Sequence, residues 1–275
     1  SLEPCSHYGK TPPCADLIIE KRIPRVVVGC QDPFARVAGR GIQKLRQAGR
    51  TVVVGVLEDE CRELNRKFIT FHTLKRPYVT LKWAESADGY IDLCRTGGHP
   101  VVFSSERTQM LVHKLRAEHA AILVGTRTAL LDDPRLDVRR WAGPSPVRVV
   151  LDRDLELPPS ARLLDGSHPT LVFTGRADAV QRPGVEYVTV DYGRDVLPQL
   201  LAGLHARGLQ SLLVEGGARL LQSFIDSGLW DEAYVEQSPL VLGAGVGAPL
   251  MPRGSVCECL SAFGRAYRHY GCRRT

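Results

Sequence analysis

The feature that most constrains the fold is a series of short, apolar, β-branched runs separated by segments with helical periodicity. Seven of these runs predict strands, at residues 78–83, 120–124, 147–152, 170–174, 186–190, 211–214 and 232–238. Helices are predicted between them at residues 105–118, 195–207 and 218–227, and a final edge strand at 266–272. Apolar strands that alternate with helices are typical of parallel strands covered on both faces. The pattern therefore predicts an open, mostly parallel α/β sheet.

A shorter α/β pattern precedes this region. It predicts strands at residues 25–30 and 51–57, and helices at 15–21, 41–48 and 59–72. Two strands do not form a stable sheet by themselves, so we expect this region to belong to a larger, incomplete domain. The Lys-Arg-Pro segment at 75–77 resembles a linker. The predicted domains are therefore residues 1–74 and 75–275.

Composition excludes several classes of partner. The 275 residues carry a formal net charge of +6 without a block of Lys and Arg, so no nucleic-acid partner is expected. No apolar run approaches the length of a membrane span, and no secretory signal is recognised. Eight cysteines in a chain of this length do not make a disulfide scaffold. We therefore expect a reduced, cytoplasmic protein without a membrane partner.

Two Pro-Cys pairs near the start of the sequence have the character of a metal site. Cys5 and Cys14 flank a loop stiffened by Gly and Pro, and Cys14 opens a predicted helix, whose dipole favours the thiolate. A catalytic zinc site uses three protein ligands and one water. His7 is too close to Cys5 to complete the tetrahedron with a proper bite, and the residues given supply no other third ligand. We expect an incomplete zinc site; two ordinary loop cysteines are the alternative.

Two features of the longer region suggest ligand binding. The strand at 211–214 runs into Gly216-Gly217 and then into a helix, a geometry that presents backbone N–H groups to a phosphate. An ordinary strand-to-helix connection is an equal alternative for this motif alone. Lys82 lies within an apolar strand, where a charge is costly unless it is paired, functional or turned to solvent.

The sequence resembles the bifunctional pyrimidine deaminase/reductase family of riboflavin biosynthesis. The deaminase half is matched by residues 2–14, 28–33, 37–41 and 64–68, and the reductase half by 115–117, 123–139 and 149–153. The resemblance covers nearly the whole chain. It implies a truncated cytidine-deaminase-like α/β domain followed by a dihydrofolate-reductase-like α/β domain with a mostly parallel sheet.

For the first domain, the resemblance implies a Zn²⁺ held by one His and two Cys, with a Glu that shuttles protons. Cys5 and Cys14 match the two thiolates, and Lys10 lies in the loop that contacts the deaminase substrate. The His and Glu are expected upstream of Cys5, beyond the residues given. We therefore expect no deaminase activity from this chain.

For the second domain, the resemblance implies NADPH as cofactor and a phosphorylated ribosylaminopyrimidine as substrate. Lys82 would face the substrate; it is the best-placed general acid, with solvent as the alternative. The residues that match substrate-binding positions are Arg116, Leu136, Arg139 and Glu215. The residues that match cofactor-binding positions are Thr128, Asp132, Gly216, Gly217, Ala218, Arg219, Leu220 and Ser223. Two arginines can hold a phosphate dianion through paired hydrogen bonds, which suits Arg116 and Arg139.

The expected activity is the NADPH-dependent reduction of the ribosyl group to its ribityl form. One alternative is a reductase of the same fold that acts on a pterin or folate. Another is a non-catalytic remnant whose first domain mediates association with a partner or a further copy, because a truncated sheet exposes an edge.

Overall fold

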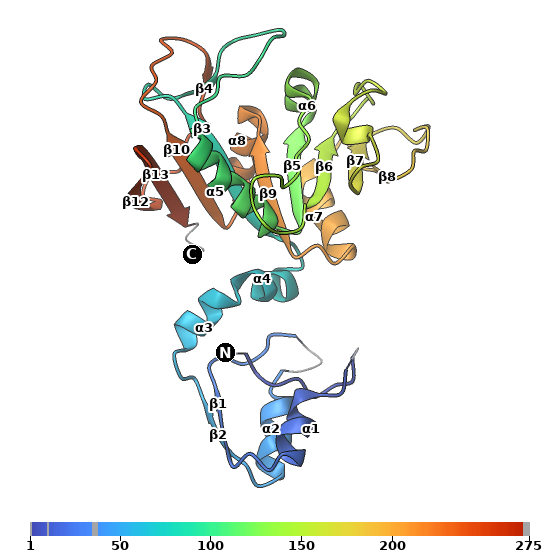
Figure 1. The fold of residues 1–275 in the computed structure, drawn as a ribbon. Coiled ribbons are helices and arrows are strands. Elements are labelled where there is room, and N and C mark those ends of the chain that lie inside the picture. The colour runs from blue at the N-terminus through green and yellow to red at the C-terminus, as the bar shows by residue number, and fades with distance from the viewer. Residues whose placement is uncertain (1, 10, 35–37, 272–275) are drawn as a thin grey trace. The chain divides into compact units, whose positions relative to one another are not determined.

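The computed structural model describes residues 2–9, 11–34 and 38–271 of the 275-residue chain. The chain forms two compact units, Ser1–Arg76 and Pro77–Thr275 (Figure 1). The boundary between them falls inside the Lys-Arg-Pro segment at 75–77.

In its described residues, the first unit consists of two parallel strands and four helices. The strands β1 (Arg25–Val28) and β2 (Thr51–Val54) pair in register. The helices are α1 (Cys14–Glu20), α2 (Arg40–Gln47), α3 (Glu58–Leu64) and α4 (Arg66–Leu74). Ala15, Ile42 and Leu45 are buried, whereas Val27 and Val54 on the two strands are 52% and 40% exposed. The pair of strands is therefore only partly covered within this unit.

The single helix predicted over 59–72 is wrong, because α3 and α4 are separated at Asn65. The Asn65 backbone departs from helical geometry, with φ −100° and ψ 12°, and its side-chain amide donates to the Cys61 carbonyl at 2.7 Å. Asn side chains compete in this way for backbone acceptors, which ends one helix and lets another begin.

The second unit is built on a nine-stranded sheet in the described chain, in the order β12-β13-β10-β3-β9-β5-β6-β7-β8. The strands from β10 to β8 are mutually parallel, and β13 and β12 are antiparallel to their neighbours. The mostly parallel sheet is therefore confirmed. The strands are β3 (Tyr78–Glu85), β5 (Ala121–Gly125), β6 (Val147–Leu151), β7 (Thr170–Thr174), β8 (Val185–Thr189), β9 (Ser211–Gly216), β10 (Glu232–Gln237), β12 (Val256–Ala262) and β13 (Arg265–Gly271).

Helices cover both faces of this sheet (Figure 1). The helices α7 (Val196–Ala206) and α8 (Ala218–Asp226) pack on one face, against side chains such as Leu123 of β5. The helices α5 (Glu106–Ala117) and α6 (Thr126–Asp132) lie on the other face, where Ile122 of β5 points. Successive residues of a strand point to opposite faces, so a strand buried on both sides is continuously apolar.

The helix ends follow the sequence signals. Ser105 caps α5 by accepting a hydrogen bond from the Thr108 N–H at 3.3 Å. Gly228, just beyond α8, takes the left-handed conformation with φ 65°, in which glycine commonly ends a helix.

The predicted edge position of the strand at 266–272 is wrong. That segment forms β13, which lies between β10 and β12, so β12 is the edge strand. Shorter elements that the sequence patterns did not reveal are β4 (Tyr90–Asp92), β11 (Val246–Gly247), α6 and the 3₁₀ helix η1 (Arg162–Leu164). None of the helices in the described residues combines the length and apolar character needed to cross a bilayer.

Candidate active site

A cavity of about 820 Å³ opens at the carboxyl ends of the central strands of the second unit. Lys82 of β3, Gly125 of β5 and Glu215 of β9 all line it. Ligands of open α/β sheets bind in this position, outside the carboxyl ends of the strands. The cavity brings together most of the predicted site residues: Lys82, Arg116, Thr128, Asp132, Arg139, Glu215, Gly216, Gly217, Ala218, Arg219 and Leu220.

The centre of the cavity is an ion pair between Arg116 of α5 and Glu215 of β9. Arg116 Nε donates to Glu215 Oε1 at 2.8 Å, and Nη2 donates to Oε2 at 2.6 Å. Both side chains are mostly buried, at 13% and 10% exposure. The third nitrogen, Nη1, donates to the Asp137 carbonyl at 3.1 Å. All three nitrogens of Arg116 are therefore engaged within the protein.

The ion pair fixes the charge of Glu215. Burial by itself would raise the pKa of this carboxyl, but the Arg116 guanidinium outweighs burial and the pKa is lowered. Glu215 is therefore an anion at neutral pH, with its plane set by the paired hydrogen bonds.

Lys82 lies on the same face of the sheet as Glu215. In the β3–β9 register Thr80 lies opposite Leu213, so Lys82 and Glu215 both extend toward α5. Burial lowers the pKa of Lys82, while the carboxylates of Glu215 and Glu236 oppose that shift. Glu236 is 2% exposed and accepts a hydrogen bond from Ser104 Oγ at 2.6 Å. Lys82 is thus a buried amine whose charged form depends on two acids.

The turn at Gly216-Gly217 brings backbone into the cavity and leads into α8. A Cβ added at Gly217 would lie 3.0 Å from Thr128 Oγ1, so a larger residue would force the Thr128 side chain to shift. No side chain caps α8 at Gly217, which leaves the first N–H groups of the helix open toward the cavity. These groups and Thr128 fit the phosphates of a dinucleotide cofactor.

The other predicted residues are placed differently. Leu136 is buried, with a left-handed φ of 52°, and lines a smaller neighbouring cavity. Ser223 is exposed on α8 and donates to the Arg219 carbonyl, and it does not line the large cavity. Arg139 pairs with the Asp137 carboxylate, and its backbone N–H donates to His113 Nδ1 at 3.2 Å.

Several residues of the site were not found from the sequence. Arg95 donates to Asp92 Oδ2 at 2.7 Å and is paired with Asp132, so the predicted cofactor-binding carboxylate of Asp132 is already in an ion pair. His113 lines the cavity, and burial, together with Arg116 and Arg139, lowers its pKa. Arg95, His113 and Glu236 occupy ordinary positions in the sequence, and only long-range contacts bring them to the cavity.

In the first unit, Cys5 and Cys14 lie side by side. The Cys14 N–H donates to Cys5 Sγ at 3.2 Å, and α1 begins at Cys14 as expected. The predicted bias of Cys14 toward thiolate is wrong, because its hydrogen bond with Cys5 and the Cys5 charge raise its pKa. Within the described residues no group of three or more His, Cys, Asp or Glu could hold a metal, so these residues do not complete a zinc site. Lys10 lies outside the described residues.

The second unit has the architecture of the dihydrofolate-reductase-like α/β reductases, with a cofactor-type turn above the central strands. A sequence model described as the RibD C-terminal domain matches residues 77–262. The chain belongs to the RibD family of riboflavin biosynthesis proteins, and this region is the family's reductase domain.

Curated relatives and solved structures agree with this assignment. The riboflavin biosynthesis protein RibD of Aquifex aeolicus is 42% identical over 252 residues, which cover 90% of this chain and 70% of the relative. RibD of Bacillus amyloliquefaciens is 39% identical over 262 residues, covering 92% and 70%. The Thermotoga maritima diaminohydroxyphosphoribosylaminopyrimidine deaminase/5-amino-6-(5-phosphoribosylamino)uracil reductase superposes with a TM-score of 0.87 at 34% identity, covering 99% of this chain and 78% of that one.

Proposed function

We propose that the second unit reduces 5-amino-6-(5-phosphoribosylamino)uracil to its ribityl form with NADPH. The observation that carries this proposal is the cavity that Lys82, the Arg116–Glu215 pair and the Gly216-Gly217 turn line together. The family assignment and the activity for which the Thermotoga maritima relative is named also support the proposal.

NADPH would supply a hydride to the sugar C1 carbon of the open-chain imine, and a proton on the imine nitrogen would complete the ribitylamine. Gly216, Gly217 and the first turn of α8 would hold its diphosphate, with Thr128 beside them. The cavity volume of about 820 Å³ is in the range that suits small-molecule and cofactor ligands.

Glu215 would accept hydrogen bonds from N–H groups of the pyrimidine or from sugar hydroxyls. Arg116 holds both carboxylate oxygens but leaves each with a further lone pair. The role we assign to Arg116 is therefore to orient Glu215, rather than to contact the substrate phosphate. Orientation of this kind places the reacting carbon next to the hydride donor.

Lys82 would donate the proton that accompanies hydride transfer. A buried amine with a lowered pKa gives up its proton more readily than a solvated lysine, while Glu215 and Glu236 keep it charged beforehand.

The test is NADPH oxidation by the purified chain, followed by absorbance with the phosphoribosylaminouracil, with a dihydropterin or dihydrofolate, and with neither. Oxidation with the first substrate alone is the expected result. NADPH oxidation only with the pterin or folate would identify that compound as the substrate instead. The absence of both NADPH oxidation and NADPH binding would contradict the proposal.

We also propose that residues 1–74 are part of a zinc deaminase domain and that residues 1–275 by themselves do not deaminate the pyrimidine. The support is the adjacent pair Cys5 and Cys14 without a third ligand among the described residues. Purified chain is assayed for ring deamination with added Zn²⁺ against Cys5→Ser as control. Turnover above that control would show that residues 1–275 do deaminate the pyrimidine.

A further inference from the structure

His113 lies in the second half of α5 and lines the large cavity, three residues before Arg116 and therefore on the same side of the helix. It is almost completely buried, with only 4% of its surface exposed. The reaction proposed for this cavity leaves His113 without a role. A buried imidazole at the wall of a ligand cavity is a candidate for a contact with the ligand.

The contacts of His113 determine which ring nitrogen carries the proton. The Arg139 backbone N–H donates to His113 Nδ1 at 3.2 Å, so Nδ1 is an acceptor and has no hydrogen. The proton of the neutral ring is therefore on Nε2. In the part of the chain that the structure describes, Nε2 has no hydrogen-bond partner. An unpaired buried donor is unfavourable, and a ligand that supplies an acceptor removes this cost.

The imidazole ring is held in its neutral form. Burial lowers the pKa of His113, and the guanidinium groups of Arg116 and Arg139 lower it further, whereas the carboxylates of Asp137 and Glu215 oppose these effects without reversing them. An anionic ligand atom would favour the imidazolium, which burial and both guanidiniums oppose. A neutral N–H is instead matched by a neutral acceptor, such as the carbonyl oxygen of an amide or lactam.

Glu215 supplies the complementary group in the same cavity. Its carboxylate accepts from Arg116, and each oxygen keeps a further lone pair. Glu215 and His113 are near enough to act on each other electrostatically. A donor near an acceptor matches a ligand edge on which C=O and N–H are neighbours. This is the edge of a lactam, and a uracil ring presents it.

We infer that His113 Nε2 donates a hydrogen bond to a carbonyl oxygen of the substrate's uracil ring, while Glu215 accepts from the neighbouring ring N–H. The inference rests on the proposed function, because the uracil is the ring of the proposed substrate. His113 is then a specificity-determining residue. A ring with no acceptor at this position leaves Nε2–H unpaired and binds less well.

The test measures binding of 5,6-diaminouracil to the full chain by calorimetry, since this compound has the proposed ring without ribose or phosphate. In His113→Asn, the side-chain oxygen replaces Nδ1 as the acceptor for the Arg139 N–H, but no donor remains at the position of Nε2. This variant should bind about tenfold more weakly. In His113→Gln, the amide NH₂ replaces the Nε2–H donor, so its affinity should be close to that of the wild type.

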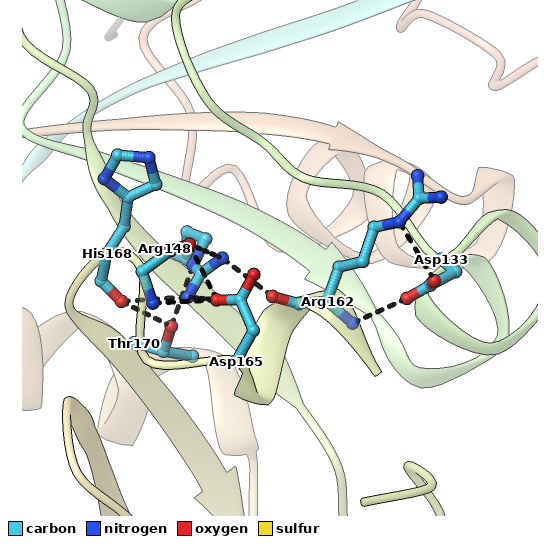
Figure 2. A network of polar contacts seen from close by, with 7 residues as sticks. Asp133, Arg148, Arg162, Asp165, His168 and Thr170 are labelled. Atoms are coloured by element: carbon cyan, nitrogen blue, oxygen red, sulfur yellow. Dashed lines mark hydrogen bonds and ion pairs between the residues drawn. The ribbon is translucent and has the colours of Figure 1, made fainter. Parts of the chain in front are cut away.

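His168→Asn is the matched control. Figure 2 shows that His168 takes part in the network around Arg148 through its carbonyl, which accepts from Nη2 at 2.9 Å. Its ring makes no hydrogen bond within the described residues, and it lines neither the large cavity nor the smaller one. Arg148 is 1% exposed and also donates to Thr170 Oγ1 at 2.9 Å, so the substitution leaves the contacts of this segment intact. The control should bind 5,6-diaminouracil as the wild type does.

Nitrogen NMR provides a second measurement. A comparison of the wild type with His113→Asn identifies the ring signals of His113, and their chemical shifts give its tautomer. The neutral Nε2–H tautomer is expected. A ring protonated on Nδ1 would overturn the inference.

Unchanged affinity in His113→Asn, or no binding of 5,6-diaminouracil by the wild type, would also overturn it. So would weaker binding by His113→Gln than by His113→Asn, because that order would show that only the Nδ1 contact matters. A loss in His113→Asn that affects ribose 5-phosphate and spares 5,6-diaminouracil would contradict the lactam contact as well. If 5,6-diaminouracil binds as expected but no NADPH is oxidised, the lactam contact stands and the proposed reductase function fails.

Discussion

At the scale of single residues, Glu3 organises the first unit to a degree that its position near the start of the sequence did not indicate. It is 4% exposed, and its carboxylate accepts four backbone hydrogen bonds, from Asp32, Gly39, Gly41 and Ile42. One acidic side chain thereby fixes the described parts of the loop before α2, at Asp32 and Gly39, and the first turn of that helix.

Glu3→Gln should destabilise this loop by about 3 kcal/mol, because the amide NH₂ would face two backbone donors that lose their acceptor. Hydrogen exchange at the amides of Gly41 and Ile42 measures the effect, and exposed Glu60→Gln serves as control. Exchange as slow as in the wild type would show that the carboxylate is not what holds this loop.

Lys82 gives a prediction about pH. Its pKa is lowered by burial, so if it is the proton donor, the reduction rate should fall as the pH rises through a value below that of an ordinary lysine. Glu236→Gln removes one of the two carboxylates that raise this pKa, and the fall should therefore move to lower pH.

The measurement is the pH profile of kcat for the wild type and Glu236→Gln, with exposed Glu156→Gln as the control. Coincident profiles in all three proteins would leave solvent as the proton donor.

Sequence reasoning found the residues that belong to recognisable segments and missed those defined by distant contacts. Lys82, Arg116 and Glu215 were expected from family-like stretches, and they line one cavity. The pairing of Arg116 with Glu215 was not expected, since the two residues are 99 positions apart. Arg95 and His113 were missed for the same reason, because only partners that the fold brings near place them at the cavity.

At the scale of elements, the connection from β9 to α8 is where the space around the backbone most limits the choice of residue. Gly217 has an ordinary φ of −79°, and a Cβ there would press on Thr128 Oγ1 at 3.0 Å. Gly217→Ala should therefore displace Thr128 and raise the Kd for NADPH about tenfold.

Fluorescence titration with NADPH measures the effect. Gly247→Ala is the control, since a Cβ there would meet nothing within 4 Å. Equal affinity of the two variants for NADPH would show that the Gly216-Gly217 turn does not bind the cofactor.

Long apolar strands were the most predictable elements, and short or mixed ones the least. The centres of the segments that form β5 and β7 are continuously apolar, because both faces of each strand are covered, and this pattern predicted them as strands. The strand β12 has its two polar residues, Glu258 and Ser261, three positions apart, so the segment lacks the alternation of a strand and only its pairing with β13 defines it. The seven residues of α6 are too few for a clear helical period.

At the scale of the whole molecule, the two units differ in how complete they are. The second has apolar clusters on both faces of its sheet, whereas the first has two strands with exposed valines. Residues 77–275 expressed alone should therefore unfold in one cooperative transition and have the same affinity for NADPH as residues 1–275. Circular dichroism and fluorescence titration provide the test, and a broad transition or lost binding would show that the second unit depends on the first.

The order of strands also determines when the site comes into existence as the chain is made. Strand β9 lies between β3 and β5, although it follows both of them in the sequence by some distance. A nascent chain that has not yet reached Ser211 has an unfilled place at the centre of its sheet, and it lacks Glu215 and the glycine turn. The cavity can therefore form only after β9 has been synthesised and has inserted between β3 and β5.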